Sequence, residues 1–539
     1  MSSSSGFVPP LSLLFEDECT EGPRAAGGED SRVRELLGRW SRDEPLEERL
    51  GIVLEAGDLL RGCSAAVLPE VLIWLRDLRG HWDPQVRLAA GMAMARGVDA
   101  EQPGMALEVL NGAADLEIWR EVPWVGAMPE ELVEHLGGTS AAVVRWVADE
   151  CDVGTRTELC VTLAGHSDED RRAGAVQVAG KLVGCRRSPV VRLMPVLEEW
   201  TLDPGAVTRR YATHLLAALG GDASLLAERL HDSEPWVRDI AAWGLARQED
   251  PRCLSHLGER LDAYGTATSY STGTPYGYST ALPSLVEVLG RLEAHAPVLL
   301  PLIRERLRRP DDRMAPSLAT VVGEWGEAAA EAEPELLGLL GTEAHLAAVK
   351  ALARIGSAAA VPVLERMMRR PPGRPTEWES RWSRLVVAWA YWKLAGDPGP
   401  VLEELDAAFQ GRYGQALWPY FEDLGPLAAV HAPRLRDLLE RRDAYTRVGA
   451  ASSLHRITGD AAEVFPTLWE VAYPLATGSF QPVRWEALRR IARSGMVPDR
   501  IRPVLAELAG TDRRLRCHGG WRAVDEDREH RELIAGMLA

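Results

Sequence analysis

The chain has 539 residues, of which 46% are hydrophobic and 26% charged, and its formal net charge is −18. This composition is typical of an ordinary soluble protein, long enough for several domains or one extended array. No apolar run approaches the ~18 to 20 residues that span a membrane, and residues 1–28 lack the basic and apolar regions of a signal peptide. The sequence therefore predicts a cytoplasmic protein with no membrane contact.

The seven cysteines are scattered, and no two have the C-x-x-C spacing. This pattern suits reduced thiols and argues against a disulfide or zinc framework. Only three of the 61 basic residues are lysine, whereas alanine, glycine, proline and arginine are abundant. Such a bias indicates a GC-rich bacterial genome, such as that of an actinobacterium; the alternative is selection for arginines that bind phosphate.

Acidic side chains are concentrated in the N-terminal third. Residues 1–150 hold 13 basic and 27 acidic residues, whereas residues 151–539 hold 48 and 52. The first part should repel nucleic acid and anionic membranes, while the second could still present a local basic patch.

The chain opens with a segment, residues 1–30, that is rich in serine, glycine, proline and acids, and we expect a disordered acidic tail there. Residues 31–263 then show helical periodicity interrupted by glycine, proline or aspartate. The clearest helix lies within residues 231–246, where Ser233 or Glu234 is expected to cap a helix that begins at Pro235.

This pattern of a proline, a valine-arginine pair and small apolar residues recurs along the chain. A close copy contains Pro84, Val86 and Arg87, and partial copies surround other basic residues: Arg172, Arg209, Lys350, Arg447 and Arg484. The pattern resembles the HEAT repeat family. That resemblance implies an all-α fold, an α-solenoid of stacked antiparallel helix pairs, in which the repeated arginine (Arg87, Arg238 or Arg484) belongs to an internal ladder of hydrogen bonds.

Residues 264–280 break the periodicity and contain four tyrosines separated by serine, threonine and glycine: Tyr264, Tyr270, Tyr276 and Tyr278. Tyrosine offers a large contact area with few rotatable bonds, and long loops in compact arrays are often functional. We expect an inserted loop that either binds a partner or is an unstructured spacer. Helical repeats resume over residues 281–516, and residues 517–539 are expected to form a capping helix.

A second candidate site lies where arginines precede a tryptophan-rich helix. Four tryptophans share one side of that helix, together with Leu385: Trp378, Trp382, Trp389 and Trp392. The arginines are Arg369, Arg370 and Arg374. This group could bind an anion or stack on a planar ligand, although an aromatic stripe at helical spacing is also what a buried face looks like. Trp236 and Trp243, seven residues apart, are assigned to packing.

Recognisable catalytic motifs are missing: there is no G-x-S-x-G, Walker loop or H-E-x-x-H. No histidine is followed by glutamate, so the iron ligands of deoxyhypusine hydroxylase, a HEAT-repeat enzyme, have no match. His166 with the acids that follow it, and Cys517 with residues 518–530, have metal-ligand side chains without a converging spacing. We expect no metal and no cofactor.

These features favour a non-catalytic scaffold that binds a protein or peptide partner on a curved helical surface, with contacts from the tyrosine-rich loop. One alternative is a HEAT-like enzyme that acts on nucleic acid, resembling DNA glycosylases of this architecture. The other is a protein that binds or modifies a small molecule in a pocket under the loop. A basic patch facing the cleft in the C-terminal half would favour the nucleic-acid hypothesis.

Overall fold

The computed structural model describes residues 30–94 with short gaps, Val144, Ala148, and residues 153–263, 283–309, 313–369, 377–409 and 414–539. Within these ranges every regular element is a helix, and a single isolated bridge joins Arg186 to Arg513. The prediction of an all-α chain is therefore confirmed. Residues 1–29 and 264–280, for which we expect a tail and an inserted loop, lie outside the described residues.

The first three described helices pack around their own small core. They are α1 (Asp30–Arg39), α2 (Leu46–Leu59) and α3 (Leu68–Leu78). Val33, Val53 and Leu75 are fully buried between them, and this cluster is separate from the core of the later helices.

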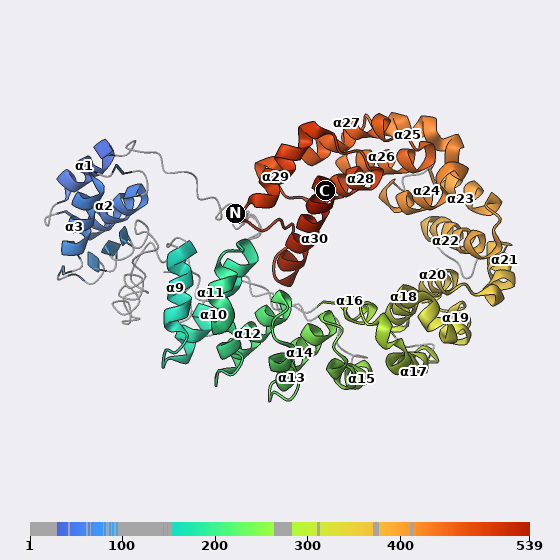
Figure 1. Cartoon of the computed structure of the whole chain (residues 1–539), viewed down its shortest axis with the longest axis horizontal. Helices are drawn as coiled ribbons and strands as arrows, with labels where there is room; N and C mark the ends of the chain where they lie inside the picture. The colour runs from blue at the N-terminus through green and yellow to red at the C-terminus, as the bar shows by residue number, and fades with distance from the viewer. Residues whose placement is uncertain are drawn as a thin grey trace, which may run out of the picture.

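From Val153 onward the helices alternate between two layers (Figure 1). The inner layer consists of α10 (Glu169–Cys185), α12 (Ala206–Leu219), α14 (Pro235–Arg247), α16 (Leu285–Gly290), α18 (Ala315–Trp325), α20 (His345–Ile355), α22 (Glu377–Ala395), α24 (Trp418–Leu424), α26 (Ala444–Thr458) and α28 (Pro482–Ser494). The outer layer consists of α9 (Val153–Leu163), α11 (Pro189–Trp200), α13 (Ala223–Arg229), α15 (Leu254–Ala263), α17 (Ala296–Leu307), α19 (Glu333–Leu339), α21 (Val361–Arg369), α23 (Gly399–Phe409), α25 (Ala432–Leu438), α27 (Ala461–Ala472) and α29 (Arg502–Gly510). This is the predicted α-solenoid of stacked helix pairs.

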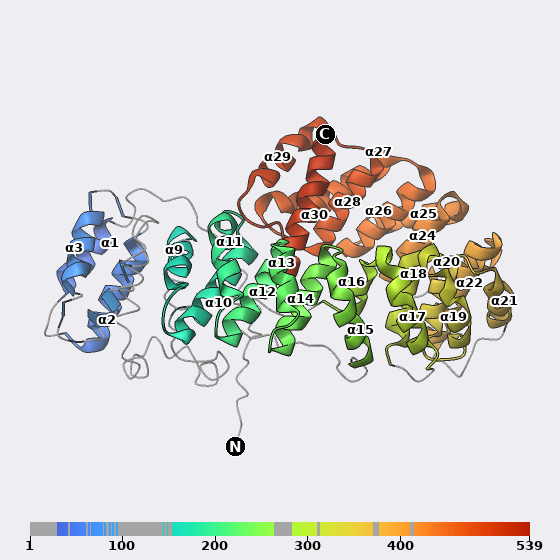
Figure 2. The same ribbon diagram turned by 60° about the horizontal axis from the view of Figure 1, so that its bottom comes forward.

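The solenoid curves into a ring whose last repeats rise above its first ones (Figures 1 and 2). The last helix, α30 (Trp521–Leu538), lies inside the ring and packs on α28 and α29 as well as on α10 and α12. The segment expected to cap one end of the array thus contacts both ends, and the ring is closed.

Aspartates start many of the helices, because their carboxylates accept the backbone N–H groups that a helix leaves free at its first turn. Asp168 caps α10, and Asp443 caps α26. In α14 neither Ser233 nor Glu234 provides a side-chain cap; instead the Asp232 carboxylate accepts the N–H of Glu234 at 3.0 Å. Pro235 takes the first helical position, as predicted.

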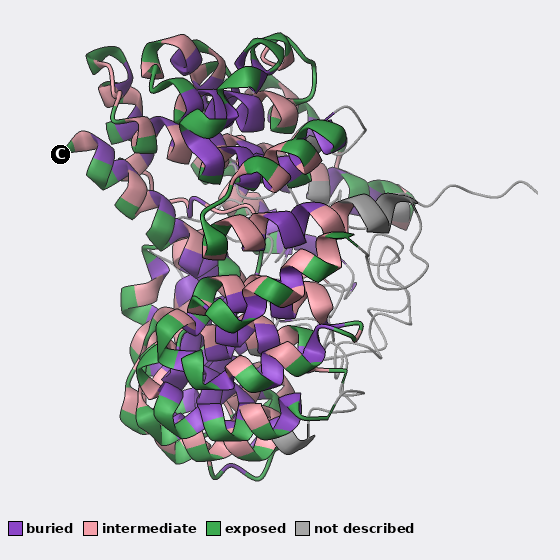
Figure 3. Ribbon diagram, turned by 90° about the vertical axis from the view of Figure 1, so that its right-hand side faces the viewer, coloured by how far each residue is buried: buried purple, intermediate pink, exposed green. Residues whose placement is uncertain are grey.

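One continuous core runs between the two layers from Val144 to Met537, and Figure 3 shows its buried residues along the facing sides of the helices. Glycines let the inner helices approach closely. A Cβ atom on Gly244 of α14 would lie 2.6 Å from the Cβ of Ala217 on α12, and one on Gly449 of α26 would lie 2.1 Å from Nε1 of Trp418 on α24. Both distances are shorter than a van der Waals contact, so these positions require glycine.

None of the helices in the described ranges has the length and apolar character needed to cross a membrane.

Candidate functional site

The predicted tryptophan stripe lies at a junction between two inner helices. Trp382 and Trp389 of α22 meet the ring of Tyr420 on α24 edge-on, at centroid distances of 5.6 and 6.1 Å. The indole N–H of Trp389 donates to the Asp423 carboxylate at 2.8 Å. Burial raises the pKa of Tyr420 to about 12, so its hydroxyl stays neutral. These rings are packed against each other edge-on.

The rest of the stripe is divided between core and surface. Leu385 is fully buried, whereas Trp382, Trp389 and Trp392 are half-buried. The Lys393 amine lies 4.9 Å from the Trp392 ring centroid, a cation–π distance. The side chain of Trp378 lies outside the described residues. The stripe is therefore partly a packing surface, as the alternative interpretation holds.

Of the arginines proposed beside the stripe, the structure describes Arg369. Arg369 is exposed on α21, in the outer layer, where it pairs with Glu365 of the same helix. Arg370, Arg374 and all four loop tyrosines, Tyr264, Tyr270, Tyr276 and Tyr278, lie outside the described residues, and their proposed roles remain predictions.

Cations and carboxylates alternate near the C-terminal ends of the inner helices in the second half of the ring. The Arg490 guanidinium of α28 bonds Glu422 of α24 at 2.5 Å, reaching past α26, and Glu486 of its own helix at 2.6 Å. Lys393 of α22 lies 3.7 Å from Asp423 of α24. These pairs place carboxylates among the cations of this part of the inner layer, where Arg354, Arg456 and Arg493 are also exposed.

The repeated arginines form the expected ladder in the first half of the ring. Arg172 donates to the Asp203 carboxylate of the next repeat at 2.6 and 3.1 Å and to the backbone carbonyl of His166. Arg209 makes the same pattern one repeat later, with the Asp232 carboxylate and the Asp203 carbonyl. Each aspartate also accepts a backbone N–H at the start of its own helix, so the ladder ties each repeat to the next.

Three other repeated arginines show the local half of this pattern. Arg87, Arg238 and Arg484 each donate to a carbonyl of the turn before their own helix, namely those of His81, Asp232 and Ser479. The prediction of internal structural arginines is confirmed, and none of these three bonds reaches an adjacent repeat.

The ends of the ring meet through the backbone at residues 183–188 and 511–515. The backbone N–H of Arg514 donates to the Cys185 carbonyl at 2.9 Å, and the guanidinium of Arg514 donates to the Val183 carbonyl. The Asp512 carboxylate accepts the N–H and the hydroxyl of Ser188 at 2.7 and 2.9 Å. Ser188 precedes α11, so a residue more than 300 positions away caps the start of this helix.

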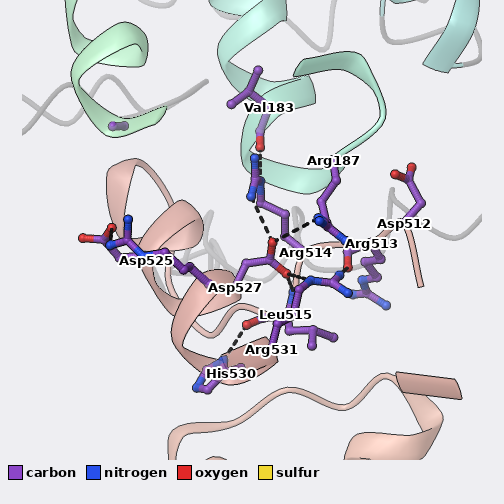
Figure 4. A network of polar contacts seen from close by, with 12 residues as sticks. Val183, Arg187, Asp512, Arg513, Arg514, Leu515, Asp525, Asp527, His530 and Arg531 are labelled. Carbon is purple, nitrogen blue, oxygen red and sulfur yellow. Dashed lines mark hydrogen bonds and ion pairs between the residues drawn. The ribbon is translucent and has the colours of Figure 1, made fainter. Parts of the chain in front are cut away.

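Asp527 of α30 holds this joint together (Figure 4). Its carboxylate accepts Arg514 at 3.0 Å and Arg531 at 2.9 Å, lies 3.8 Å from the Arg187 guanidinium, and accepts the N–H of Leu515. The side chain of Asp527 is 3% exposed, so its negative charge is stabilised by these partners instead of by water.

One turn earlier, α30 contacts the inner face of α14 and the residue that follows α16. The Asp525 carboxylate accepts two hydrogen bonds from Arg247 of α14, at 2.5 and 2.6 Å, and lies 3.6 Å from Arg291. The ring of Trp521 meets that of Trp243 at 5.6 Å, and Trp243 is 4% exposed. Trp243 is buried as predicted, but it is the C-terminal helix that covers it.

His530 anchors the other side of α30. Its ring stacks on Trp485 of α28 at a centroid distance of 3.7 Å, with 7° between the planes. Its Nδ1 lies 2.6 Å from the Leu515 carbonyl, and its Nε2 lies 3.2 Å from the Arg489 guanidinium. A carbonyl can only accept and a guanidinium can only donate, so His530 is neutral with its proton on Nδ1. Burial lowers the pKa of His530 to about 4, in agreement with this assignment.

The histidine, cysteine and acidic residues considered as metal ligands make structural hydrogen bonds and ion pairs. Nδ1 of His166 accepts the backbone N–H of Asp168, and Glu526 pairs with the His518 ring and accepts the backbone N–H of Cys517. Across the described ranges, no three histidine, cysteine or acidic side chains converge as metal ligands would.

Similarity to known proteins is found among solved structures. No protein-family model matches the chain, and no curated protein matches it by sequence. Among solved structures, the chain is similar to importin beta (11% identity, covering 95% of this chain and 80% of that one, TM-score 0.40). It is also similar to the complex of CpcE and CpcF of phycocyanin lyase from Nostoc sp. PCC7120 (18% identity, 46% and 92%, TM-score 0.31) and to YibA from E. coli (15% identity, 56% and 98%, TM-score 0.30).

Proposed function

We propose that this protein is a non-catalytic scaffold that binds a protein or peptide partner on the inner face of its ring. The observation that carries the proposal is that this face already binds a helix, because α30 lies across α10 and α12 and meets α14 through Trp243 and Arg247. A surface that binds a helix of the same chain has the aromatic and charged side chains that recognition of another helix requires.

The carboxylates of the inner layer support a protein partner over nucleic acid. A surface that binds phosphate needs arginines and lysines in excess, and binding strength follows the number of phosphates neutralised. In the second half of the ring carboxylates of the inner helices pair with some of their cations, as Glu422 does with Arg490 and Asp423 does with Lys393. Mixed charges of this kind suit the polar rim of a protein interface.

The tyrosine-rich loop, residues 264–280, is proposed to add contacts to the same partner. It follows α15 and precedes α16 in the chain. Deleting residues 266–279 should leave the melting temperature unchanged and weaken partner binding, whereas undiminished binding would remove the loop from the proposal.

The experiment that tests the scaffold places a photo-cross-linking amino acid at inner-layer positions and matched outer positions, in the native host at native expression. Arg354 of α20 and Lys393 of α22 are exposed on inner helices, and Val298 of α17 and Val430, just before α25, are exposed on the outside. We expect one protein to cross-link from Arg354 and Lys393 and not from Val298 or Val430. Cross-linked nucleic acid, or identical patterns from both sets, would overturn the proposal.

A further inference from the structure

The two ends of α30 are held by different chemistry. The C-terminal half is anchored in the core: Ile534 and Met537 are 0% and 4% exposed, His530 stacks on Trp485, and the Leu538 carbonyl accepts Arg502 at the start of α29. This half belongs to the same body as α28 and α29, and nothing short of unfolding would release it.

The N-terminal half buries Ala523 and Val524, and it meets α14 and the residues around α16 through one aromatic contact and several ion pairs. We call the partners of this half the α30-binding surface, which consists of Trp243, Arg247, Glu287 and Arg291. When both members of an ion pair return to water together, hydration replaces much of their mutual attraction. The net free energy lost is therefore much smaller than the gross Coulomb attraction of the pair. Parting this joint would therefore expose ion pairs, the indole rings of Trp243 and Trp521, and the smaller apolar side chains of Ala523 and Val524.

The α30-binding surface contacts three side chains of α30 that form a short sequence pattern. Trp521 contacts Trp243, Arg522 donates to Glu287 at 2.8 Å, and Asp525 bonds Arg247 at 2.5 and 2.6 Å and faces Arg291 at 3.6 Å. Residues 521 and 525 are four apart and so lie on one side of a helix. The surface thus recognises an aromatic residue, then a base, then a carboxylate one turn beyond the aromatic.

The surface would keep its charges when the N-terminal half of α30 leaves it. Asp525 and Arg528 would leave together, and two guanidinium groups, those of Arg247 and Arg291, would remain beside an exposed indole. The Arg247 side chain is 5% exposed in the closed ring and its guanidinium lies 5.2 Å from the Trp243 ring centroid, so its position is fixed by packing as well as by Asp525. A helix without a carboxylate at the matching position would leave these two guanidinium groups without a carboxylate partner.

We propose that the α30-binding surface is a recognition site for an amphipathic helix of a partner protein, that this helix carries the pattern aromatic, base, two residues, carboxylate, and that α30 is the intramolecular occupant of the site. Partner binding then displaces the N-terminal half of α30, and the ring opens when the bonds of Arg514 and Asp512 to residues 183–188 also break. This inference rests on the proposed function, because it names the place on the inner face, the class of partner and its regulation.

An intramolecular occupant has an effective concentration of about millimolar, so α30 should exclude a free peptide of its own sequence from the intact chain. The test uses a fluorescent synthetic peptide of residues 517–539 and the full chain. Asp525→Arg places a fourth guanidinium among Arg247, Arg291 and Arg528, which should free the surface without altering it. We expect this variant to bind the peptide at least tenfold more tightly than the unmodified chain and to have a larger radius of gyration in solution scattering.

Matched controls separate the surface from general charge effects. Glu529→Arg makes the same charge reversal at an exposed position of α30. Its affinity for the peptide should equal that of the unmodified chain. Adding Arg247→Glu to Asp525→Arg, or replacing Asp525 by asparagine in the peptide, should abolish peptide binding. Trp521→Ala serves as a second opening variant should Asp525→Arg fail to fold.

The inference is overturned when a folded opening variant binds the peptide no better than the unmodified chain does, or when the asparagine peptide binds equally well. That result would not contradict the proposed function, because the proposed function is tested separately, by cross-linking at Arg354 and Lys393. Conversely, peptide binding without any protein cross-linked from Arg354 or Lys393 would support the recognition site and contradict the proposed function.

Discussion

Arg247 on α14 and Asp525 on α30 lie 278 positions apart in the chain and share two hydrogen bonds across the closed ring. Their side chains are 5% and 6% exposed. A buried pair of this kind is costly to form, yet it is even more costly to break from one side, because the remaining charge stays buried without its partner.

Arg247→Met should therefore weaken the joint of the ring. We expect the free energy of local opening at α30 to fall by about 3 kcal/mol, at the low end for a broken buried pair because Arg528 still bonds Asp525 at 2.9 Å. Hydrogen exchange of the α30 amides measures this opening directly. The control is Arg522→Met, whose pair with Glu287 is nearly half exposed and should contribute about 0 to 1 kcal/mol. Equal effects of the two substitutions would contradict the ranking.

Trp243→Ala should destabilise the chain by about 3 to 5 kcal/mol, the usual cost of removing a buried tryptophan. Its ring packs against Trp521 and lies 5.0 Å from the His214 ring, so the loss falls on the joint between α12, α14 and α30. Trp236→Ala is the matched change on the same helix, where the half-buried ring lies 5.0 Å from the Arg210 guanidinium, and it should cost less. Thermal melts of the two variants compare these losses of stability. An unchanged melting temperature for Trp243→Ala would show that the burial of Trp243 contributes nothing to stability.

The sequence predicts the repeats because their signals are local. Pro235 at the first position of α14, Asp168 at the start of α10 and the apolar spacing within each helix involve residues within two turns of one another. The local half of the arginine pattern was also predictable, since each arginine bonds the turn just before its own helix, as Arg238 does with the Asp232 carbonyl. Trp243 likewise reads as a buried side chain from its place on the apolar side of its helix.

Ring closure has no such local signal. The meeting of Arg514 with Cys185, or of Asp525 with Arg247, depends on the small rotation between successive repeats, summed over the whole array. Asp525 and Asp527 stand in a helix rich in charge, where sequence reasoning expects exposed side chains, and both are buried. The tryptophan stripe shows the same difficulty, because its partner Tyr420 comes from another repeat.

Gly449→Ala tests the close approach of two inner helices. The added methyl group would lie 2.1 Å from Nε1 of the buried Trp418, so α24 and α26 must move apart, at a cost of about 1 to 3 kcal/mol. Gly338→Ala in α19 is the matched control, because no atom lies within 4 Å of the new methyl and alanine favours a helix by about 1 kcal/mol. Thermal melts should move in opposite directions, and a stabilised Gly449→Ala variant would show that the helices have room to spare.

The joint of the ring should also respond to pH through His530. In the folded chain its ring is neutral and buried between Trp485 and Arg489, and burial lowers its pKa to about 4. In the unfolded chain histidine has a pKa of about 6.5. Other charges near His530 are those of Glu526 and Asp527 on its own helix, which favour the protonated ring but do not offset its burial.

Above pH 6.5 both states hold a neutral ring, so the contribution of His530 to stability is complete. As the pH falls from 6.5 to about 4 the unfolded chain takes up a proton that the folded chain refuses, and stability decreases by about 3 kcal/mol before levelling off. His530→Gln removes this titration, so the difference in urea midpoint between the two proteins should shrink steadily over that range. Burial also lowers the pKa of His431, which is present in both proteins and cancels in the comparison. A difference that stays constant from pH 7 to pH 4 would mean that His530 titrates alike in both states and is not held neutral by the ring.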